Sequence, residues 1–135
     1  MPMTNQAVFA QLPANEIATL TSPAAITSRA NITGTTGLTL LSAVPTGSNP
    51  KRIDSILVKS KGTSLAGTVF VWVYDGTTSF LYDEILLSAV TASATVDSTS
   101  AAKSYTGLNL KATQQLYVSV SVSQDLNVFA STGNY

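Results

Sequence analysis

Apolar and polar residues alternate along much of the chain, in segments separated by turn sequences. The most regular alternation runs from Leu116 to Ser123, where Leu or Val occupies every even position and Tyr or Ser every odd one. Successive side chains of a strand point to opposite faces of its sheet, so this period of two predicts a strand. We expect one face of this strand to be buried and the other to present hydroxyl groups to water.

The strongest strand signal is the segment 68–74, in which β-branched and aromatic residues follow one another without interruption. Asp75-Gly76 comes next, and this dipeptide tolerates the positive φ angles of a type I′ turn. Alternation then resumes over residues 77–87. The sequence therefore predicts a β-hairpin whose first strand lies in the centre of a sheet.

Further segments combine apolar residues with flanking turn residues: 38–44, 52–60, 88–96, 104–110 and 125–130. In the second of these, the consecutive apolar residues Ile56, Leu57 and Val58 predict burial on both faces. Residues 97–103 are mostly polar or small and predict a loop. About eight short strands separated by turns are typical of an all-β fold, and we expect an antiparallel jelly roll or β-sandwich.

The first 25 residues differ from the rest, because short apolar pieces are interrupted by three of the five prolines. We expect an extended N-terminal arm over residues 1–25, followed by the sandwich domain over residues 26–135. Exposed apolar side chains need a surface to cover. The arm's apolar residues are therefore candidate contacts with a partner or with a second subunit: Val8, Phe9, Leu12, Ile17 and Leu20.

The composition is neutral and poor in charge. Only 10% of the residues are charged and the formal net charge is zero, whereas 17 serines and 19 threonines supply polarity. This balance argues against electrostatic binding to nucleic acid. No apolar run approaches the roughly 20 residues that span a membrane, and the first residues lack the features of a secretory signal. We expect neither a membrane nor a nucleic acid as a partner.

Residues that carry common enzyme chemistry are missing. The chain has no Cys and no His, so it lacks thiol nucleophiles, the usual zinc ligands and the histidine base of a hydrolytic triad. Asp83 and Glu84 are adjacent on a predicted strand, so their side chains point to opposite faces and cannot act as a catalytic pair. We expect no enzyme activity, catalytic residue, metal, cofactor or small-molecule substrate.

Two clusters allow alternative interpretations. Aromatic residues flank the predicted hairpin, and they either pack in the core or form a platform for stacking sugars: Trp72, Tyr74, Phe80 and Tyr82. Cations gather in one short stretch, and they either form a basic patch or protect a sheet edge from unwanted pairing: Lys51, Arg52, Lys59 and Lys61. Core packing and edge protection are the more economical interpretations.

The segment 52–77 begins with Arg-Ile-Asp and ends an apolar strand with Tyr-Asp-Gly-Thr. The later Asp-Glu-Ile-Leu of residues 83–86 and the closing Asn-Val-Phe-Ala of residues 127–130 follow in the same order. With these motifs, residues 50–135 resemble small structural proteins of tailed bacteriophages. The motifs belong to strands and turns, so the resemblance offers no catalytic residues to transfer.

The resemblance implies a capsid decoration, or cement, protein with a jelly-roll body. Such a protein is expected on the outer surface of the virion head after synthesis in the host cytoplasm. It is expected to form a homotrimer and to bridge capsomers of the major capsid protein. The alternative is a tail-associated receptor- or carbohydrate-binding β-sandwich module.

Overall fold

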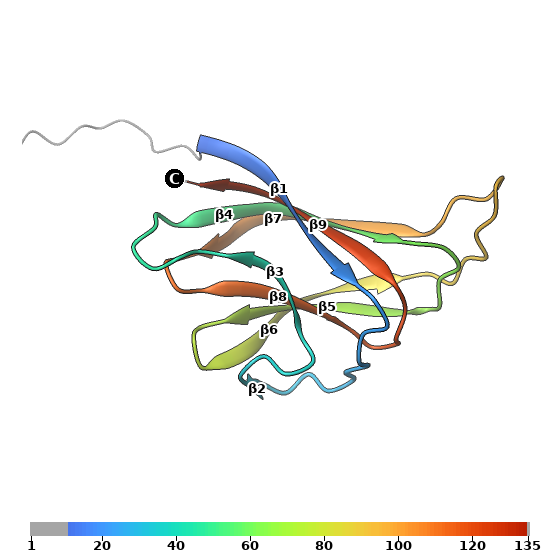
Figure 1. The fold of residues 1–135 in the computed structure, drawn as a ribbon, viewed down its shortest axis with the longest axis horizontal. Coiled ribbons are helices and arrows are strands. Elements are labelled where there is room, and N and C mark those ends of the chain that lie inside the picture. Colours follow the sequence, from blue (N-terminus) through green and yellow to red (C-terminus); the bar gives the residue numbers. More distant parts are fainter. Residues whose placement is uncertain (1–10, 135) are drawn as a thin grey trace, which may run out of the picture.

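The computed structural model describes residues 11–134, and these residues contain two antiparallel β-sheets packed face to face (Figure 1). The predicted all-β sandwich is confirmed. Among the described residues there is no helix long and apolar enough to cross a membrane.

The four-stranded sheet has the order β1 (Gln11–Leu20), β9 (Leu126–Asn134), β4 (Lys51–Ser60) and β7 (Ser100–Leu110). The five-stranded sheet has the order β2 (Ile32–Thr33), β6 (Thr78–Leu87), β5 (Gly67–Tyr74), β8 (Gln115–Val120) and β3 (Thr39–Ala43). If the two-residue β2 is left out and the other eight strands are counted along the chain, the four-stranded sheet contains the first, eighth, third and sixth of them, in that order. Those of the other sheet are fifth, fourth, seventh and second, which is the strand order of a jelly roll.

The core lies between the two sheets and is built from every second residue of the central strands. Strand β8 supplies Leu116, Val118 and Val120, each with at most 1% of its surface exposed. Apolar residues of the neighbouring strand β5 and of β4 and β9 in the facing sheet belong to the same core and are equally buried: Val69, Val71, Ile53, Ile56, Val58, Leu126 and Val128. The period of two in the sequence thus has its origin in this shared layer.

The β5–β6 hairpin is confirmed, although its turn is not of type I′. Only Gly76 has a positive φ, of 108°, and the connection is closed by a hydrogen bond of 3.1 Å from the Asp75 amide to the Thr78 carbonyl. The Asp75 carboxylate accepts hydrogen bonds from the amides of Thr78 and Thr77 at 2.8 and 2.9 Å. These bonds hold the pKa of Asp75 below its ordinary value.

The predicted strand at 88–96 is wrong, and the predicted loop at 97–103 is correct only over residues 97–99. Residues 88–99 form a loop with only two isolated bridges, Ser64 to Val90 and Ser93 to Val96, and this loop extends past the ends of the sheets in Figure 1. Strand β7 already begins at Ser100. The physical reason is that 88–99 is rich in Ser, Thr and Ala, so it has few side chains whose burial would hold a strand against the core.

Residues 21–38, here called the covering segment, cross the outer face of the five-stranded sheet and include its short edge strand β2 (Figure 1). The Ile26 amide donates to the Val120 carbonyl at 2.8 Å on the β8 side of this sheet. On the β6 side, the Ser79 hydroxyl donates to the Gly34 carbonyl at 2.7 Å. The segment thus crosses the sheet on the side away from the other sheet, as the blue-to-cyan trace in Figure 1 shows.

The covering segment buries two aromatic residues of β5 outside the core. Phe70 and Trp72 are 2% and 0% exposed, and the Arg29 guanidinium lies 5.6 Å from the centroid of the Phe70 ring. The Trp72 indole N–H donates to the hydroxyl of Ser119, which is itself 1% exposed, at 2.9 Å. The prediction that the hydroxyl face of β8 is open to water is therefore wrong at this position.

The predicted boundary at residue 25 does not coincide with the edge of the sandwich. Residues 11–20 form β1, which pairs with β9 along its length, and Ala18 and Leu20 are buried in the core. Pro13 is tolerated because β1 is an edge strand. Deleting residues 1–20 would therefore remove a sheet strand, and only residues 1–10 of the predicted arm lie outside the described residues.

Candidate binding surfaces

Of the predicted contact residues of the arm, the two whose side chains the structure describes do not lie together. Val8 and Phe9 lie outside the described residues, and Leu12 lies near the start of β1. Ile17 and Leu20 point to opposite faces of the four-stranded sheet, because Ile17 is 60% exposed and Leu20 only 1%. Of the five predicted contacts, Ile17 is thus shown on an open surface and Leu20 is shown in the core.

Ile17 belongs to a line of apolar side chains across the outer face of the four-stranded sheet. It lies opposite Phe129, Phe129 lies opposite Leu57, and Leu57 lies opposite Ala102. Residues paired in this way share one face of the sheet and touch their neighbours. We call Ile17, Phe129, Leu57 and Ala102 the apolar row.

The apolar row is partly open to water. Ile17 and Leu57 are 60% and 41% exposed, Ala102 is exposed and Phe129 is half-buried. The prediction that Leu57 would be buried is wrong, because only its neighbours Ile56 and Val58 face the core. Periodicity in β4 did not reveal this, since the three residues are all apolar.

The surroundings of the apolar row are almost uncharged. On one side it is flanked by the cross-strand residues Asn15, Ser131, Ser55 and Ser104, and on the other by Thr19, Asn127, Lys59 and Ser100. A hollow of about 270 Å³ lies along it, lined by Asn15, Ser55, Leu57, Phe129 and Ser131. A face of this chemistry suits another uncharged protein surface better than a nucleic acid or a charged ligand.

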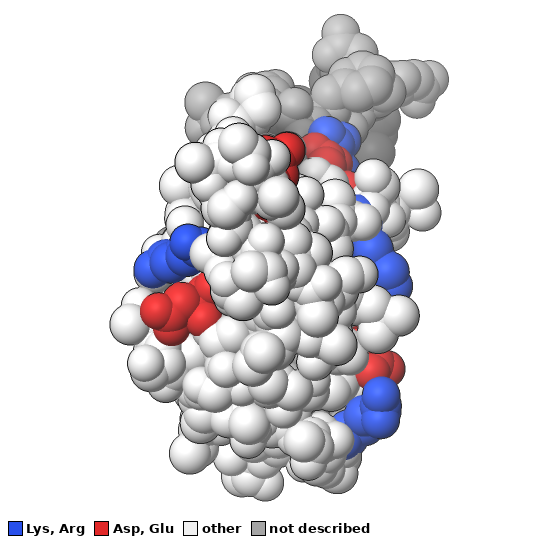
Figure 2. Space-filling view, turned by 90° about the vertical axis from the view of Figure 1, so that its right-hand side faces the viewer, with Lys and Arg blue, Asp and Glu red and all other residues white. Residues whose placement is uncertain are grey.

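The cations predicted as a cluster do not form a basic patch. Lys51 points into the protein and is 7% exposed, and Arg52 pairs with Asp54 at 2.5 Å. The Lys59 ammonium donates to the carbonyl of Ser98 at 2.9 Å. On the side shown in Figure 2, charged residues lie singly or in pairs of opposite sign on a mostly uncharged surface.

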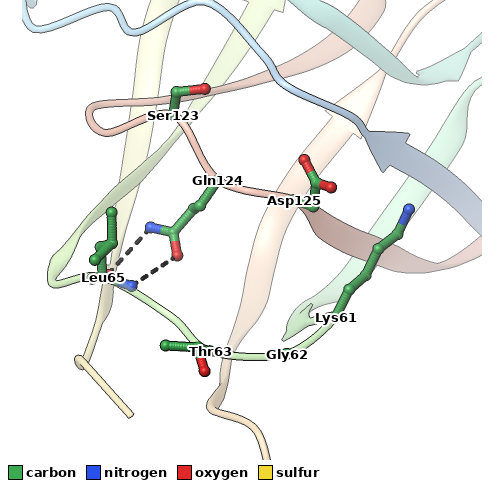
Figure 3. Close-up of a pocket in the computed structure, with 7 residues that line it drawn as sticks. All are labelled: Lys61, Gly62, Thr63, Leu65, Ser123, Gln124 and Asp125. Carbon is green, nitrogen blue, oxygen red and sulfur yellow. Dashed lines mark hydrogen bonds between the residues drawn. The ribbon is translucent and has the colours of Figure 1, made fainter. Parts of the chain in front are cut away.

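A second hollow, of about 450 Å³, lies between two loops at one end of the sandwich (Figure 3). The Gln124 amide bridges them, since it donates to the Leu65 carbonyl and accepts from the Leu65 amide, both at 3.1 Å. Its lining is Lys61, Gly62, Thr63, Leu65, Ser123, Gln124 and Asp125. In residues 11–134 there is no group of three or more His, Cys, Asp or Glu side chains that could hold a metal ion. The hydrogen bonds of Gln124 hold the two loops together at this end of the sandwich.

The aromatic residues of the hairpin divide between two environments. Trp72 is buried, so it cannot belong to a sugar-stacking platform, and Tyr74 packs edge-on against Tyr117 with ring centroids 5.9 Å apart. Phe80 and Tyr82 are 42% and 46% exposed. The core interpretation is thus correct for Trp72, whereas the two aromatic residues of β6 remain available at the surface.

Asp83 joins β6 to β7 beside these aromatic residues. Its carboxylate accepts hydrogen bonds from the Lys103 ammonium and from the Tyr105 hydroxyl, both at 2.9 Å, and from the Glu84 amide at 2.8 Å. Burial by itself raises the pKa of Asp83, but these bonds outweigh it and lower the pKa below its ordinary value. Burial and the contact with Asp83 raise the pKa of Tyr105.

Asp83→Asn is expected to destabilise the protein at neutral pH and to have little effect in acid. Because the folded-state pKa is depressed, the carboxylate stabilises the fold above its unfolded pKa of about 4, and this contribution is lost as the pH falls through the folded value. We expect a loss of about 1–2 kcal/mol at pH 7. Urea unfolding of both proteins from neutral to acidic pH measures the difference, and a constant difference would contradict this role. Tyr105→Phe should give a smaller loss.

A scan against protein-family models finds no match for this chain, and a search of curated proteins finds none either.

Proposed function

We propose that this protein is a non-enzymatic structural protein of a phage virion, which binds the outer surface of the head and stabilises it by bridging capsomers of the major capsid protein. The observation that carries the proposal is the apolar row, an exposed apolar line on an uncharged sheet face. The resemblance of residues 50–135 to phage structural proteins supplies the kind of partner. The homotrimer implied by that resemblance remains a prediction.

The chemistry of this surface suits binding in many copies. A flat sheet face with a few exposed apolar side chains makes a weak contact, and an array of such contacts on a symmetric shell gains strength through avidity. The formal net charge of zero lets neighbouring copies lie close together without mutual repulsion. Absence of His and Cys from the sequence fits a role in binding.

The decisive experiment locates the polypeptide in virions of the source phage. Heads and tails are separated on a density gradient, and the protein is identified and counted in each fraction by mass spectrometry. Many copies per head would support the proposal. A few copies with the tails would contradict it and favour the second candidate, and absence from both fractions would exclude a virion role.

The second candidate function is a tail-associated receptor- or carbohydrate-binding module. It is favoured by Phe80 and Tyr82, which are 42% and 46% exposed on one strand, with the Tyr82 ring 5.8 Å from that of Tyr105. Exposed aromatic rings are the side chains on which sugars stack. Trp72 fluorescence would be a poor probe of such binding because the indole is fully buried.

Ile17→Asp and Leu57→Asp are each expected to weaken binding to heads by about tenfold or more, because each places a charge in the apolar row. Ile17 is 60% exposed and Leu57 is 41% exposed, and both lie outside the core, so the fold should be retained. Co-sedimentation with heads that lack the protein measures the effect. The matched control is Leu86→Asp, at a leucine that is 78% exposed on the other sheet. Equal binding by all three variants would exclude the apolar row as the docking face.

A further inference from the structure

Strand β7 lies at one edge of the four-stranded sheet. Strand β7 pairs with β4, and no other strand in residues 11–134 pairs with it. An edge of this kind presents backbone N–H and C=O groups that can pair with another chain, and proteins usually protect it with charges, prolines or bulges. The opposite edge of the same sheet is formed by β1, which contains Pro13.

The regular part of this edge is short and has a definite centre. Residues 100–104 pair one to one with residues 55–59 of β4. The register then shifts, so the next paired residue of β7 is Leu108, opposite Ile53. A bulge of this kind bends a strand and ends regular pairing. The regular edge is therefore five residues long and is centred on Ala102.

The side chains of this segment favour close approach of another strand. Its outer face carries only Ser100, Ala102 and Ser104, and Ala102 ends the apolar row at the edge. The one charged residue, Lys103, shares the inner face with its buried partner Ile56, and its ammonium is bound by Asp83 at 2.9 Å. The lysine that could protect the edge is thus directed toward β6.

We propose that two copies of this protein associate through β7, in antiparallel orientation, with Ala102 of one copy opposite Ala102 of the other. The two four-stranded sheets then form one continuous sheet, and the two apolar rows join end to end. The inference does not depend on the proposed function. Its two-fold symmetry is an alternative to the three-fold assembly that the resemblance implies, and the mass of the protein in solution decides between them.

Three features select this register. A slip of one residue would place outer-face side chains opposite inner-face ones. Centring on Lys103 would place two lysines opposite each other, whereas centring on Ala102 pairs each Lys103 with Ala101 of the other copy. Centring on Ala101 would offset the apolar rows. Paired strands alone bury less surface than a standard interface, so we expect the dimer to appear only at high protein concentration.

The test places charges of either sign at residue 102, which lies on the proposed two-fold axis, and measures dimerisation. The mass of the full chain in solution is measured by sedimentation over about two orders of magnitude in concentration, and the wild type should shift from monomer to dimer. Ala102→Glu and Ala102→Lys should each remain monomeric, because like charges then face each other. An equimolar mixture of the two variants should recover the dimer, since opposite charges meet only when residue 102 faces residue 102.

Controls separate this contact from others. Asn15→Glu and Asn15→Lys change the same sheet face in β1 and should leave dimerisation unchanged. A chain without residues 2–10 should also dimerise if β7 forms the contact. A monomer at every concentration, a trimer mass, or an equimolar mixture that stays monomeric would overturn the proposal.

Discussion

Replacing Trp72 with alanine is expected to lower the free energy of unfolding by about 3–5 kcal/mol. The indole is fully buried between β5 and the covering segment, and its ring centroid lies 6.3 Å from that of Phe70. Its N–H also donates to the Ser119 hydroxyl at 2.9 Å. The substitution would leave a cavity and would deprive a buried hydroxyl of its donor.

Urea unfolding followed by circular dichroism measures this loss, because Trp72 is the only tryptophan and its fluorescence disappears in the variant. Trp72→Phe should lose less, about 1–2 kcal/mol, since it keeps most of the packing and removes only the hydrogen bond. Tyr82→Ala, at an aromatic residue that is 46% exposed on the same hairpin, is the control. A Trp72→Ala loss no larger than that of Tyr82→Ala would show that the covering segment does not seal this face.

Lys51→Met is expected to destabilise the protein by about 2–4 kcal/mol, because it leaves one member of a mostly buried ion pair without its partner. Lys51 is only 7% exposed. Its ammonium contacts the Glu16 carboxylate at 2.5 Å and donates to the Ala43 carbonyl at 2.9 Å. It also contacts the Ser42 hydroxyl at 3.2 Å. Lys51 thus ties β4 to β1 in its own sheet and to β3 in the other.

The double variant Lys51→Met/Glu16→Leu should recover most of the stability, to within about 1 kcal/mol of the wild type, because apolar side chains of similar size can replace such a pair. The loss of stability expected for Lys51→Met is smaller than for breaking a fully buried ion pair, since the Glu16 side chain is 29% exposed. Urea unfolding of the wild type and the variants forms a double-mutant cycle. If the two substitutions were simply additive, the ion pair would have no special role in joining the strands.

Much of the strand content was predictable because its causes are local. The uninterrupted β-branched and aromatic run before Asp75-Gly76 predicted β5, and the turn dipeptide predicted the hairpin. Strand β4 was predicted to within one residue. Residues 88–99 were harder, because Ser, Thr and Ala are compatible with an edge strand or a loop, and the choice depends on whether a neighbour is available to bury them.

Little of the candidate surface was predictable. Ile17 was a candidate contact, but Leu57 and Phe129 were not connected with it, because the residues of the apolar row come from four strands far apart in the sequence. Leu20 was assigned to the same surface and lies in the core. An extended segment with apolar residues has the same sequence pattern whether it covers a partner or joins its own sheet.

By itself, the sequence determined the class of fold, the position of the hairpin turn and the alternation of most strands, because a period of two and turn chemistry act over a few residues. Only the tertiary structure decided which face of each strand is buried and which strand or segment it packs against. It placed β1 beside β9, with Ile17 opposite Phe129, and it laid the covering segment over Trp72 and Ser119. Such pairings depend on register between segments far apart in the chain, and alternation specifies faces but not neighbours.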